Sequence, residues 1–234
     1  MQALLAPGVL LLSYILGSIP FGLVIVRVSA GKDIRKVESG RTGGTNAMRA
    51  AGFWAGLSTA LLDMLKSAST VWIARALVPG DIWIQVIAPV LAILGHNYSI
   101  FLMERDEHGR LRLRGGAGGA PTAGGAMGLW MPSILFIVPL AALILFGVGY
   151  ASVATMSAAL IASAVFAVKA ALNGSPWQYV AYGLLAEILL IWALRPNIRR
   201  LIEGKERLVG WRARRLKKAQ EGNYSSSSSS SSKS

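Results

Sequence analysis

Apolar runs long enough to cross a lipid bilayer occupy most of this chain. Six of them occur along the 234 residues, at about 4–26, 53–77, 82–103, 122–147, 149–171 and 176–194. A helix needs about 20 apolar residues to cross the hydrocarbon core, where lipid offers no hydrogen-bond partner to an open backbone. The sequence therefore predicts an all-α, polytopic membrane protein. The first run continues past the length of a signal peptide, and we expect it to be a retained span.

Lysine and arginine are concentrated in three segments, which follow the first, third and last apolar runs. Positive charge marks the cytoplasmic side of a membrane protein. We therefore expect all three segments on that side, with the N-terminus outside and the C-terminus cytoplasmic. This topology accounts for the net charge of +13 without a nucleic-acid partner. The absence of cysteine excludes disulfides, thiolate metal ligands and a cysteine nucleophile.

The run at 122–147 is expected to return to the side from which it enters. If it crossed once, the last basic segment would lie outside. We expect two short helices with a break near Pro132, which gives about seven transmembrane or re-entrant helices in all. Such short helices are tolerated where they are buried in protein or line a cavity.

Two charged residues lie one turn apart in the second run. A lone charge at the centre of a membrane helix costs roughly 2.5–3.5 kcal/mol, so Asp63 and Lys66 are expected to pair at this i,i+3 spacing. The pair is either a self-neutralising structural element or a group that faces a substrate. Glu187, in the last run, has no partner near it in the sequence and either accepts a hydrogen bond or faces water.

A glycine-rich stretch separates the third run from the fourth. Residues 114–122 read Arg-Gly-Gly-Ala-Gly-Gly-Ala-Pro-Thr. Glycines let the backbone adopt positive φ and let N–H groups converge, and a helix N-terminus that follows such a loop favours an anion. The stretch is either a phosphate-binding loop or a flexible hinge between two membrane helices.

The basic segments carry further groups suited to a phosphorylated ligand. The first runs from Lys32 to Arg49 and combines glycines and arginines with hydroxyl and amide donors, although a solvated loop would also be polar. His96 lies near the cytoplasmic end of its helix, where a histidine is either a hydrogen-bonded structural residue or a catalyst. The last segment adds Asn197 and more arginines.

Together, these segments resemble three motifs of the bacterial membrane acyl-phosphate:glycerol-3-phosphate acyltransferase family, over about residues 4 to 207. The residues that match the three motifs are, in order, Lys32, Asp33, Arg35, Ser39, Gly40, Gly43, Thr45, Asn46 and Arg49; Gly95, His96, Tyr98, Gly115, Gly116 and Gly118; and Asn197, Ile198, Arg200, Leu201, Gly204 and Glu206. Two positions depart from the pattern, since Ala117 replaces a lysine and Leu194 a histidine. Arg41 replaces an asparagine, and an insert at 104–112 precedes the glycine-rich stretch.

The resemblance implies acyl transfer from a fatty acyl phosphate to the 1-hydroxyl of glycerol 3-phosphate, giving 1-acylglycerol 3-phosphate (lysophosphatidate) and phosphate in phospholipid biosynthesis. It implies a multi-pass protein of the bacterial inner membrane, surrounded by membrane lipids, with its site on the cytoplasmic face and with neither cofactor nor metal. Ser39, His96 and Asn197 are the expected catalytic residues. The expected substrate-binding residues are Arg35, Gly40, Arg41, Gly43, Thr45, Asn46, Arg49, Arg114, Gly115, Gly116, Gly118, Arg200 and Glu206. Either Arg41 or Arg114 would supply the charge of the missing lysine.

Two other functions stay open at this point. A family member that binds acyl phosphate or anionic lipid without catalysis would show changes such as Ala117 and Leu194. A transporter of an organic phosphate would place its charges near the midplane between repeat halves, whereas here they crowd one side and no repeat is visible.

The chain is expected to divide into three parts. The membrane domain covers residues 1–207, a basic amphipathic cytoplasmic tail covers 208–222, and a disordered serine-rich tail covers 223–234. The oligomeric state does not follow from the sequence.

Overall fold

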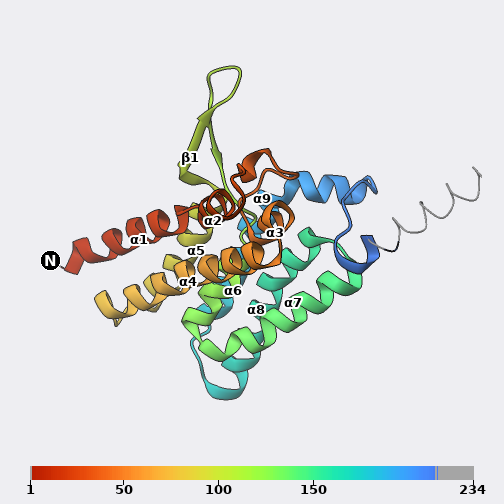
Figure 1. Cartoon of the computed structure of the whole chain (residues 1–234). Helices are drawn as coiled ribbons and strands as arrows, with labels where there is room; N and C mark the ends of the chain where they lie inside the picture. Colours follow the sequence, from red (N-terminus) through yellow and green to blue (C-terminus); the bar gives the residue numbers. More distant parts are fainter. Residues whose placement is uncertain (1, 214, 216–234) are drawn as a thin grey trace, which may run out of the picture.

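The computed structural model describes residues 2–213 and 215, and most of them are helical (Figure 1). The helices are α1 (Gln2–Ser18), α2 (Phe21–Ala30), α3 (Gly44–Ala51), α4 (Phe53–Leu77), α5 (Ile82–Asn97), α6 (Gly119–Leu129), α7 (Ile134–Val148), α8 (Ala151–Asn173) and α9 (Gln178–Ile202). Two 3-10 helices, η1 (Ile34–Lys36) and η2 (Met131–Ser133), and two strands, β1 (Ser99–Arg105) and β2 (Leu111–Arg114), complete the described elements. The expected serine-rich tail and most of the expected basic tail lie outside the described residues.

Four helical segments are long and apolar enough to cross a membrane: Leu5–Ala30, Met131–Val148, Ala151–Leu172 and Gln178–Ile202. The outer side of α7 exposes Leu135, Leu143 and Phe146, which in a membrane would contact lipid tails. The helix α4 has a different environment, because a series of its side chains, Asp63 and Lys66 included, is buried inside the molecule.

The first apolar run breaks into two helices, whereas the sequence predicted one span over 4–26. The break lies between Ser18 and Phe21, with Pro20 inside it. Proline has no N–H to continue the helical hydrogen bonds and disfavours helical backbone in the residue before it. The carbonyl of Ile19, inside the break, accepts hydrogen bonds from the N–H of Phe21 at 3.1 Å and from the Lys66 ammonium group on α4 at 2.8 Å.

The break predicted near Pro132 is present. α6 ends at Leu129, η2 contains Pro132, and α7 then runs back (Figure 1). The far end of α7 lies against the segment after α9, where Arg212 donates to the carbonyl of Val148 at 2.7 Å. The run from α6 to α7 thus starts and finishes beside the basic segments, as the charge pattern requires.

Arg75 on α4 provides hydrogen bonds for the end of α6. Its guanidinium donates to the carbonyls of Gly128 and Leu129 at 2.9 and 2.6 Å, and also to Gln85 Oε1 and the Tyr179 hydroxyl. The last carbonyls of a helix have no partner within it, and a cation beside them also interacts favourably with the helix dipole. A short helix that ends inside an apolar molecule therefore depends on such a residue.

Glycines let the central helices approach at backbone distance. A Cβ atom at Gly124 of α6 would lie 2.1 Å from the carbonyl oxygen of Met64 on α4, and one at Gly17 of α1 would lie 2.2 Å from that of Ala92 on α5. Small residues are the usual means of close helix packing in membranes, where apolar burial does not favour one helix–helix contact over a helix–lipid contact. This packing fixes the position of α6, whose N-terminus belongs to the site described below.

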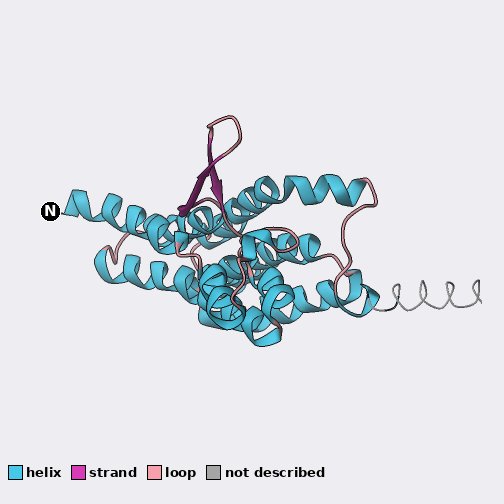
Figure 2. Ribbon diagram, turned by 45° about the horizontal axis from the view of Figure 1, so that its top comes forward, coloured by secondary structure: helices cyan, strands magenta, loops and turns pink. Residues whose placement is uncertain are grey.

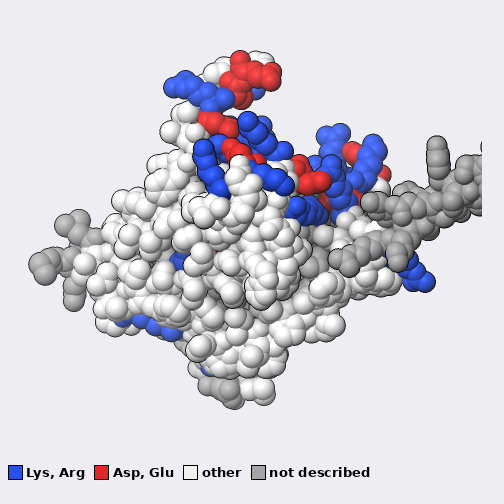
Figure 3. Space-filling view, viewed as in Figure 1, with Lys and Arg blue, Asp and Glu red and all other residues white. Residues whose placement is uncertain are grey.

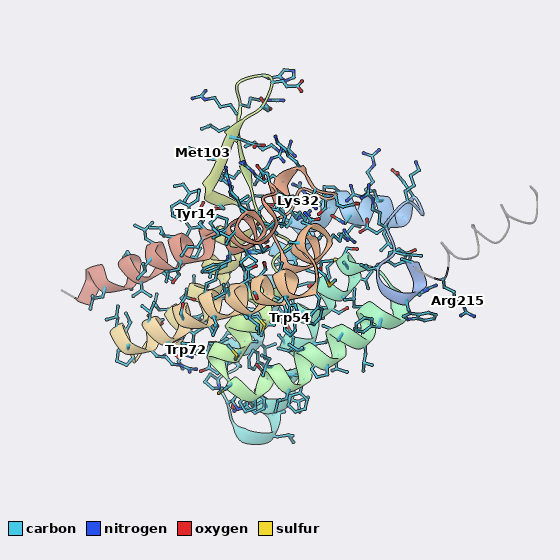
Figure 4. The ribbon with its side chains drawn as sticks, viewed as in Figure 1. Tyr14, Lys32, Trp54, Trp72, Met103 and Arg215 are labelled. Atoms are coloured by element: carbon cyan, nitrogen blue, oxygen red, sulfur yellow. The ribbon has the colours of Figure 1, made fainter. Side chains whose placement is uncertain are left out.

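A β-hairpin replaces the expected end of the third run. The helix α5 stops at Asn97, and β1 pairs antiparallel with β2, whereas 82–103 was expected to be helical. Asp106 accepts hydrogen bonds from the N–H groups of His108 and Arg110, and Gly109 has a positive φ, so the insert at 104–112 forms the turn. The hairpin projects from the helices (Figure 2), and Met103 lies exposed on its first strand (Figure 4).

We expect Gly124→Ala to destabilise the fold by about 1–3 kcal/mol, because the added methyl group has no space against the α4 backbone. Thermal unfolding in detergent would measure the loss. Gly8→Ala is the matched control: it also lies within a helix, nothing lies within 4 Å of the added atom, and alanine should raise stability by about 0.5–1 kcal/mol. Equal melting temperatures for the two variants would contradict the packing argument.

Candidate active site

The three basic segments lie on one face of the molecule (Figure 3). Contacts between them are direct: Arg207 of the last segment pairs with Glu38 of the first, and the N–H of Thr42 donates to the carbonyl of Gly115 at 3.3 Å. A cavity of about 520 Å³ opens at this face, between α3, α4, α8, α9 and the start of α6. The topology therefore brings together three segments that lie far apart in the sequence.

Most of the expected site residues line this cavity. They are Ser39, Arg41, Gly43, Thr45, Asn46, Arg49, His96, Gly118, Asn197, Arg200 and Glu206. The expected residues that do not line it are Arg35, Gly40, Arg114, Gly115 and Gly116.

Two of the expected arginines are paired outside the cavity. Arg35 pairs with Asp33 at 2.7 Å, and this hydrogen-bonded contact lowers the pKa of the Asp33 carboxyl to about 2. Arg114 pairs with Glu104 on β1. Of the two arginines expected to replace the missing lysine, Arg114 therefore has its charge paired within the hairpin.

Arg41 enters the site and joins three segments. Its guanidinium donates to the carbonyl of Gly116 at 3.0 Å, to the carbonyl of Ala193 at 2.6 Å and to Asn197 Oδ1 at 3.3 Å. Burial lowers the pKa of this guanidinium, yet it forms no ion pair within the described part of the chain. Its acceptors adjoin Ala117 and Leu194, the two positions where the sequence departs from the family pattern.

The glycine-rich stretch has two different roles along its length. The N–H of Gly116 donates to the carbonyl of His96 at 2.9 Å, and a Cβ there would lie 1.9 Å from His96 Nε2. A Cβ at Gly115 would clash with the same carbonyl. These two glycines serve close packing, which corrects the expectation that they bind a ligand. Gly118, with φ +92°, turns the chain into α6 and lines the cavity.

A carboxylate organises the polar wall of the cavity on α9. Glu206 accepts from Asn197 Nδ2 at 2.8 Å and from Arg200 Nε at 3.3 Å. Its side chain is 6% exposed, and both oxygens are used. We expected Glu206 to bind substrate; its contacts instead make it a brace for Asn197 and Arg200, since a carboxylate would repel a phosphate.

Asn46 holds the first basic segment in shape. Its amide nitrogen lies within hydrogen-bond distance of the carbonyls of Ile34, Val37 and Arg41, at 3.2, 3.0 and 2.9 Å. The residue is 3% exposed. These bonds fold the segment back on itself, so that Ser39 and Arg41 both reach the cavity.

A buried charge cluster forms the floor of the site. Lys66 pairs with Asp63 at 2.7 Å, as the i,i+3 spacing predicted, and lies 3.1 Å from Nδ1 of His96. Its third interaction is the bond to Ile19, so all three ammonium hydrogens have partners. Asp63 and His96 also line the cavity. The pair of Asp63 and Lys66 thus has both expected features, because its two charges neutralise each other and Asp63 lines the cavity.

Two groups contact Nδ1 of His96, the Lys66 ammonium nitrogen at 3.1 Å and Asp63 Oδ1 at 3.4 Å. An ammonium group only donates, so the shorter contact favours a ring whose Nδ1 accepts and whose proton is on Nε2. Nε2 is directed toward the glycine-rich stretch. In this state His96 can donate a hydrogen bond to an anionic oxygen but cannot take a proton at Nε2.

Sequence reasoning missed several residues of the cavity wall. Ser152 and Thr155, at the start of α8, line it together with Glu38 and Arg207. The two hydroxyl residues stand inside an apolar run, where serine and threonine more often bond to their own helix. Their position at the start of that helix, after Gly149, is the signal that could have identified them.

The comparisons with known proteins agree with this site. A sequence profile described as Glycerol-3-phosphate acyltransferase matches residues 8–204. The chain belongs to the glycerol-3-phosphate acyltransferase family. A relative of that name from Thermus thermophilus is 38% identical over 212 residues, which cover 87% of this chain and 95% of the relative. Another from Rubrobacter xylanophilus is 37% identical over 203 residues, with coverages of 87% and 94%.

Crystal structures of PlsY (YgiH), an integral membrane glycerol 3-phosphate acyltransferase, have the same fold. The glycerol 3-phosphate form superposes with a TM-score of 0.73 at 30% identity and covers 88% of this chain and 96% of that one. The lysophosphatidic acid form gives 0.71 at 28%, with coverages of 88% and 95%. The protein is an integral membrane protein, and its overall fold is that of the PlsY structures.

Removing one partner of the buried ion pair should destabilise the fold more than removing both. Lys66→Met leaves Asp63 buried and unpaired, with an expected loss of about 3–5 kcal/mol in unfolding free energy. The double variant Asp63→Asn/Lys66→Met should recover most of that loss, because no lone charge remains. Lys205→Met, an exposed control, should stay within about 0.5 kcal/mol of the parent. A single variant as stable as the double one would refute this account.

Proposed function

We propose that this protein transfers the acyl group of a fatty acyl phosphate to the 1-hydroxyl of glycerol 3-phosphate. The reaction would give lysophosphatidate and inorganic phosphate for phospholipid biosynthesis in a bacterial cell membrane. Membership of the family supports glycerol 3-phosphate as the acyl acceptor and acyl transfer as the reaction. The cavity supports an acyl phosphate as the donor, because its wall combines arginines with apolar side chains that include Phe53 and Leu57.

The observation that carries the proposal is unpaired positive charge at the cavity wall. Arg41 and Arg49 both line it, and neither has a carboxylate partner among the described residues, whereas Arg200 and Arg207 are paired. Arg41 is half-buried and Arg49 is exposed. Arginines without counterions at a cavity wall favour anionic ligands, and the guanidinium geometry suits phosphate. Both substrates of the proposed reaction carry a phosphate group.

The proposed reaction does not require a nucleophile from the protein. The 1-hydroxyl oxygen attacks the carbonyl carbon of the acyl phosphate and forms the ester bond. The bond from that carbon to the phosphate oxygen breaks, its electron pair leaves with phosphate, and the hydroxyl proton passes to a phosphate oxygen. A mixed anhydride has a good leaving group, so catalysis rests on positioning the substrates and stabilising negative charge.

The site residues would divide this work. Ser39, Thr45 and Arg49 would hold the phosphate and glycerol oxygens of the acceptor, and Asn197 and Arg200 would complete that side. The N–H groups at the start of α6, after Gly118, would receive the phosphate of the donor. His96 would donate from Nε2 to negative charge that develops during transfer.

The orientation in the membrane follows from the same charges. The basic segments share one face in the structure, and positive segments remain on the cytoplasmic side. We therefore infer a cytoplasmic site and an external N-terminus. The acyl donor would enter from the surrounding lipid.

The purified protein should release phosphate from palmitoyl phosphate only when glycerol 3-phosphate is present, with lysophosphatidate as the second product. Arg49→Gln should lower kcat/KM by roughly a factor of 100, since a charge-assisted contact to phosphate is lost. Arg199→Gln is the matched control, because Arg199 pairs with Glu203 outside the cavity and should retain the parental rate. Release of phosphate without the acceptor would count against acyl transfer.

One observation favours a second candidate function, the binding of acyl phosphate or anionic lipid without catalysis. Ala117 and Leu194, which replace a cationic and a proton-handling residue of the family pattern, both line the cavity. Arg41 donates to the carbonyls of Gly116 and Ala193, the residues that precede these two positions.

The variant Ala117→Lys/Leu194→His distinguishes the two functions. If Arg41 already supplies the charge, the parent is active and the double change alters kcat/KM by less than about tenfold, or lowers it because two cations crowd Arg41. The assay is the same phosphate release. Activity that appears only in the double variant would establish the binding function for the natural sequence.

A further inference from the structure

The segment after α9 crosses from one wall of the cavity to the other. It begins beyond Gly204, where the match to the family profile ends, and we call residues 205–212 the strap. The N–H of Lys205 donates to the carbonyl of Arg200 on α9 at 2.7 Å, and Arg212 reaches the carbonyl of Val148 at the end of α7. Figure 1 shows this segment running from the end of α9 to the end of α7.

The strap is attached to the junction of α7 and α8 by hydrogen bonds. Leu208 forms an antiparallel β-bridge with Tyr150, and the N–H of Val209 donates to the carbonyl of Gly149 at 2.8 Å. The indole N–H of Trp211 donates to a carbonyl in the last turn of α7 at 2.6 Å. The last carbonyls of a helix have no partner within it, so the strap supplies their donors. Most residues of the strap are exposed, and its attachment therefore does not depend on a buried core.

The strap also forms part of the cavity wall. Glu206, the brace of Asn197 and Arg200, lies in it, and so does Arg207. Arg207 pairs with Glu38 of the first basic segment, which lines the cavity as well. Because the basic segments share one face, the strap covers the cavity on the face that carries the charges.

Two features allow the strap to move. Gly204 and Gly210, at the two ends of its extended part, have φ of +68° and +74°, which glycine adopts without strain. Such positions can absorb the rotation of a hinge. The side chains of Arg207 and Glu38 are 66% and 44% exposed, and an exposed ion pair contributes little to stability. Segments with few buried contacts are the first to open in a folded protein.

We propose that the strap is a lid, which opens toward water to admit glycerol 3-phosphate and to release inorganic phosphate, and closes during acyl transfer. The identity of these two ligands rests on the proposed function. In the closed position, Glu206 holds Asn197 and Arg200, so closure completes the polar wall of the site. A closed lid would also keep water from the mixed anhydride of the donor, which water hydrolyses.

A reversible disulfide tests the lid, because the chain contains no cysteine. Tyr150 and Leu208 face each other without exchanging hydrogen bonds, and Cα atoms in such a pair lie about 4.5 Å apart, within the range that a disulfide spans. Oxidation of Tyr150→Cys/Leu208→Cys should lower kcat about tenfold or more, since the lid can no longer open, and dithiothreitol should restore it. Loss of free thiols verifies the bond.

The matched control places a disulfide in the hairpin. Arg105 and Leu111 are partners in the register of β1 and β2, away from the strap and the cavity wall. Arg105→Cys/Leu111→Cys should have the parental kcat in both the oxidised and the reduced state. A loss of activity in the strap variant alone therefore reports the strap and not the oxidation.

Access to the cavity is measured independently of turnover. Ala117→Cys adds a thiol to the cavity wall, and its alkylation by iodoacetate, a small water-soluble anion, is followed by peptide mass. Oxidation of the strap pair should slow alkylation at position 117 about tenfold or more, relative to Ala117→Cys alone. If turnover is absent but this slowing persists, the proposed reaction falls and the lid stands. Unchanged alkylation, or full turnover with the strap locked, would overturn the lid.

Discussion

The ammonium group of Lys66 connects the parts of the structure on which the site depends. It pairs with Asp63, donates to the carbonyl of Ile19 in the break after α1, and lies 3.1 Å from Nδ1 of His96. In an apolar molecule, each of these groups would be unfavourable without a partner, since water cannot replace it. One side chain therefore satisfies a carboxylate, a backbone carbonyl and an imidazole from three different parts of the chain, and it sets the direction in which His96 presents its proton.

Backbone contact at glycine is the second constraint. Gly115 and Gly116 lie directly on the end of α5, and Gly124 lies on α4, so the segment that leads into α6 has no freedom to move sideways. The start of α6 is thereby held at the cavity, and Arg75 satisfies its other end. A short helix that stops inside the molecule can then direct unpaired N–H groups at the cavity.

Much of this arrangement could be predicted from the sequence. The lengths of the apolar runs indicated the membrane helices, and the positions of lysine and arginine required the run at 122–147 to turn back, which it does at Pro132. The spacing of Asp63 and Lys66 predicted their pairing. The prediction failed after Asn97, because the short apolar stretch at 100–103 does not reveal whether it continues the helix or begins a strand.

The sequence by itself determined the class of fold, the common face of the basic segments and the residue types around the site, since length, charge and spacing are properties of the chain alone. Only the tertiary structure decided which of them face the cavity. It paired Arg114 with Glu104, brought Arg41 beside Ala117 and Leu194, and packed Gly116 against His96. It also brought the hydroxyl of Ser152 to the same cavity. The physical reason is that the direction of a side chain depends on the partners that distant helices offer, and no local pattern records them.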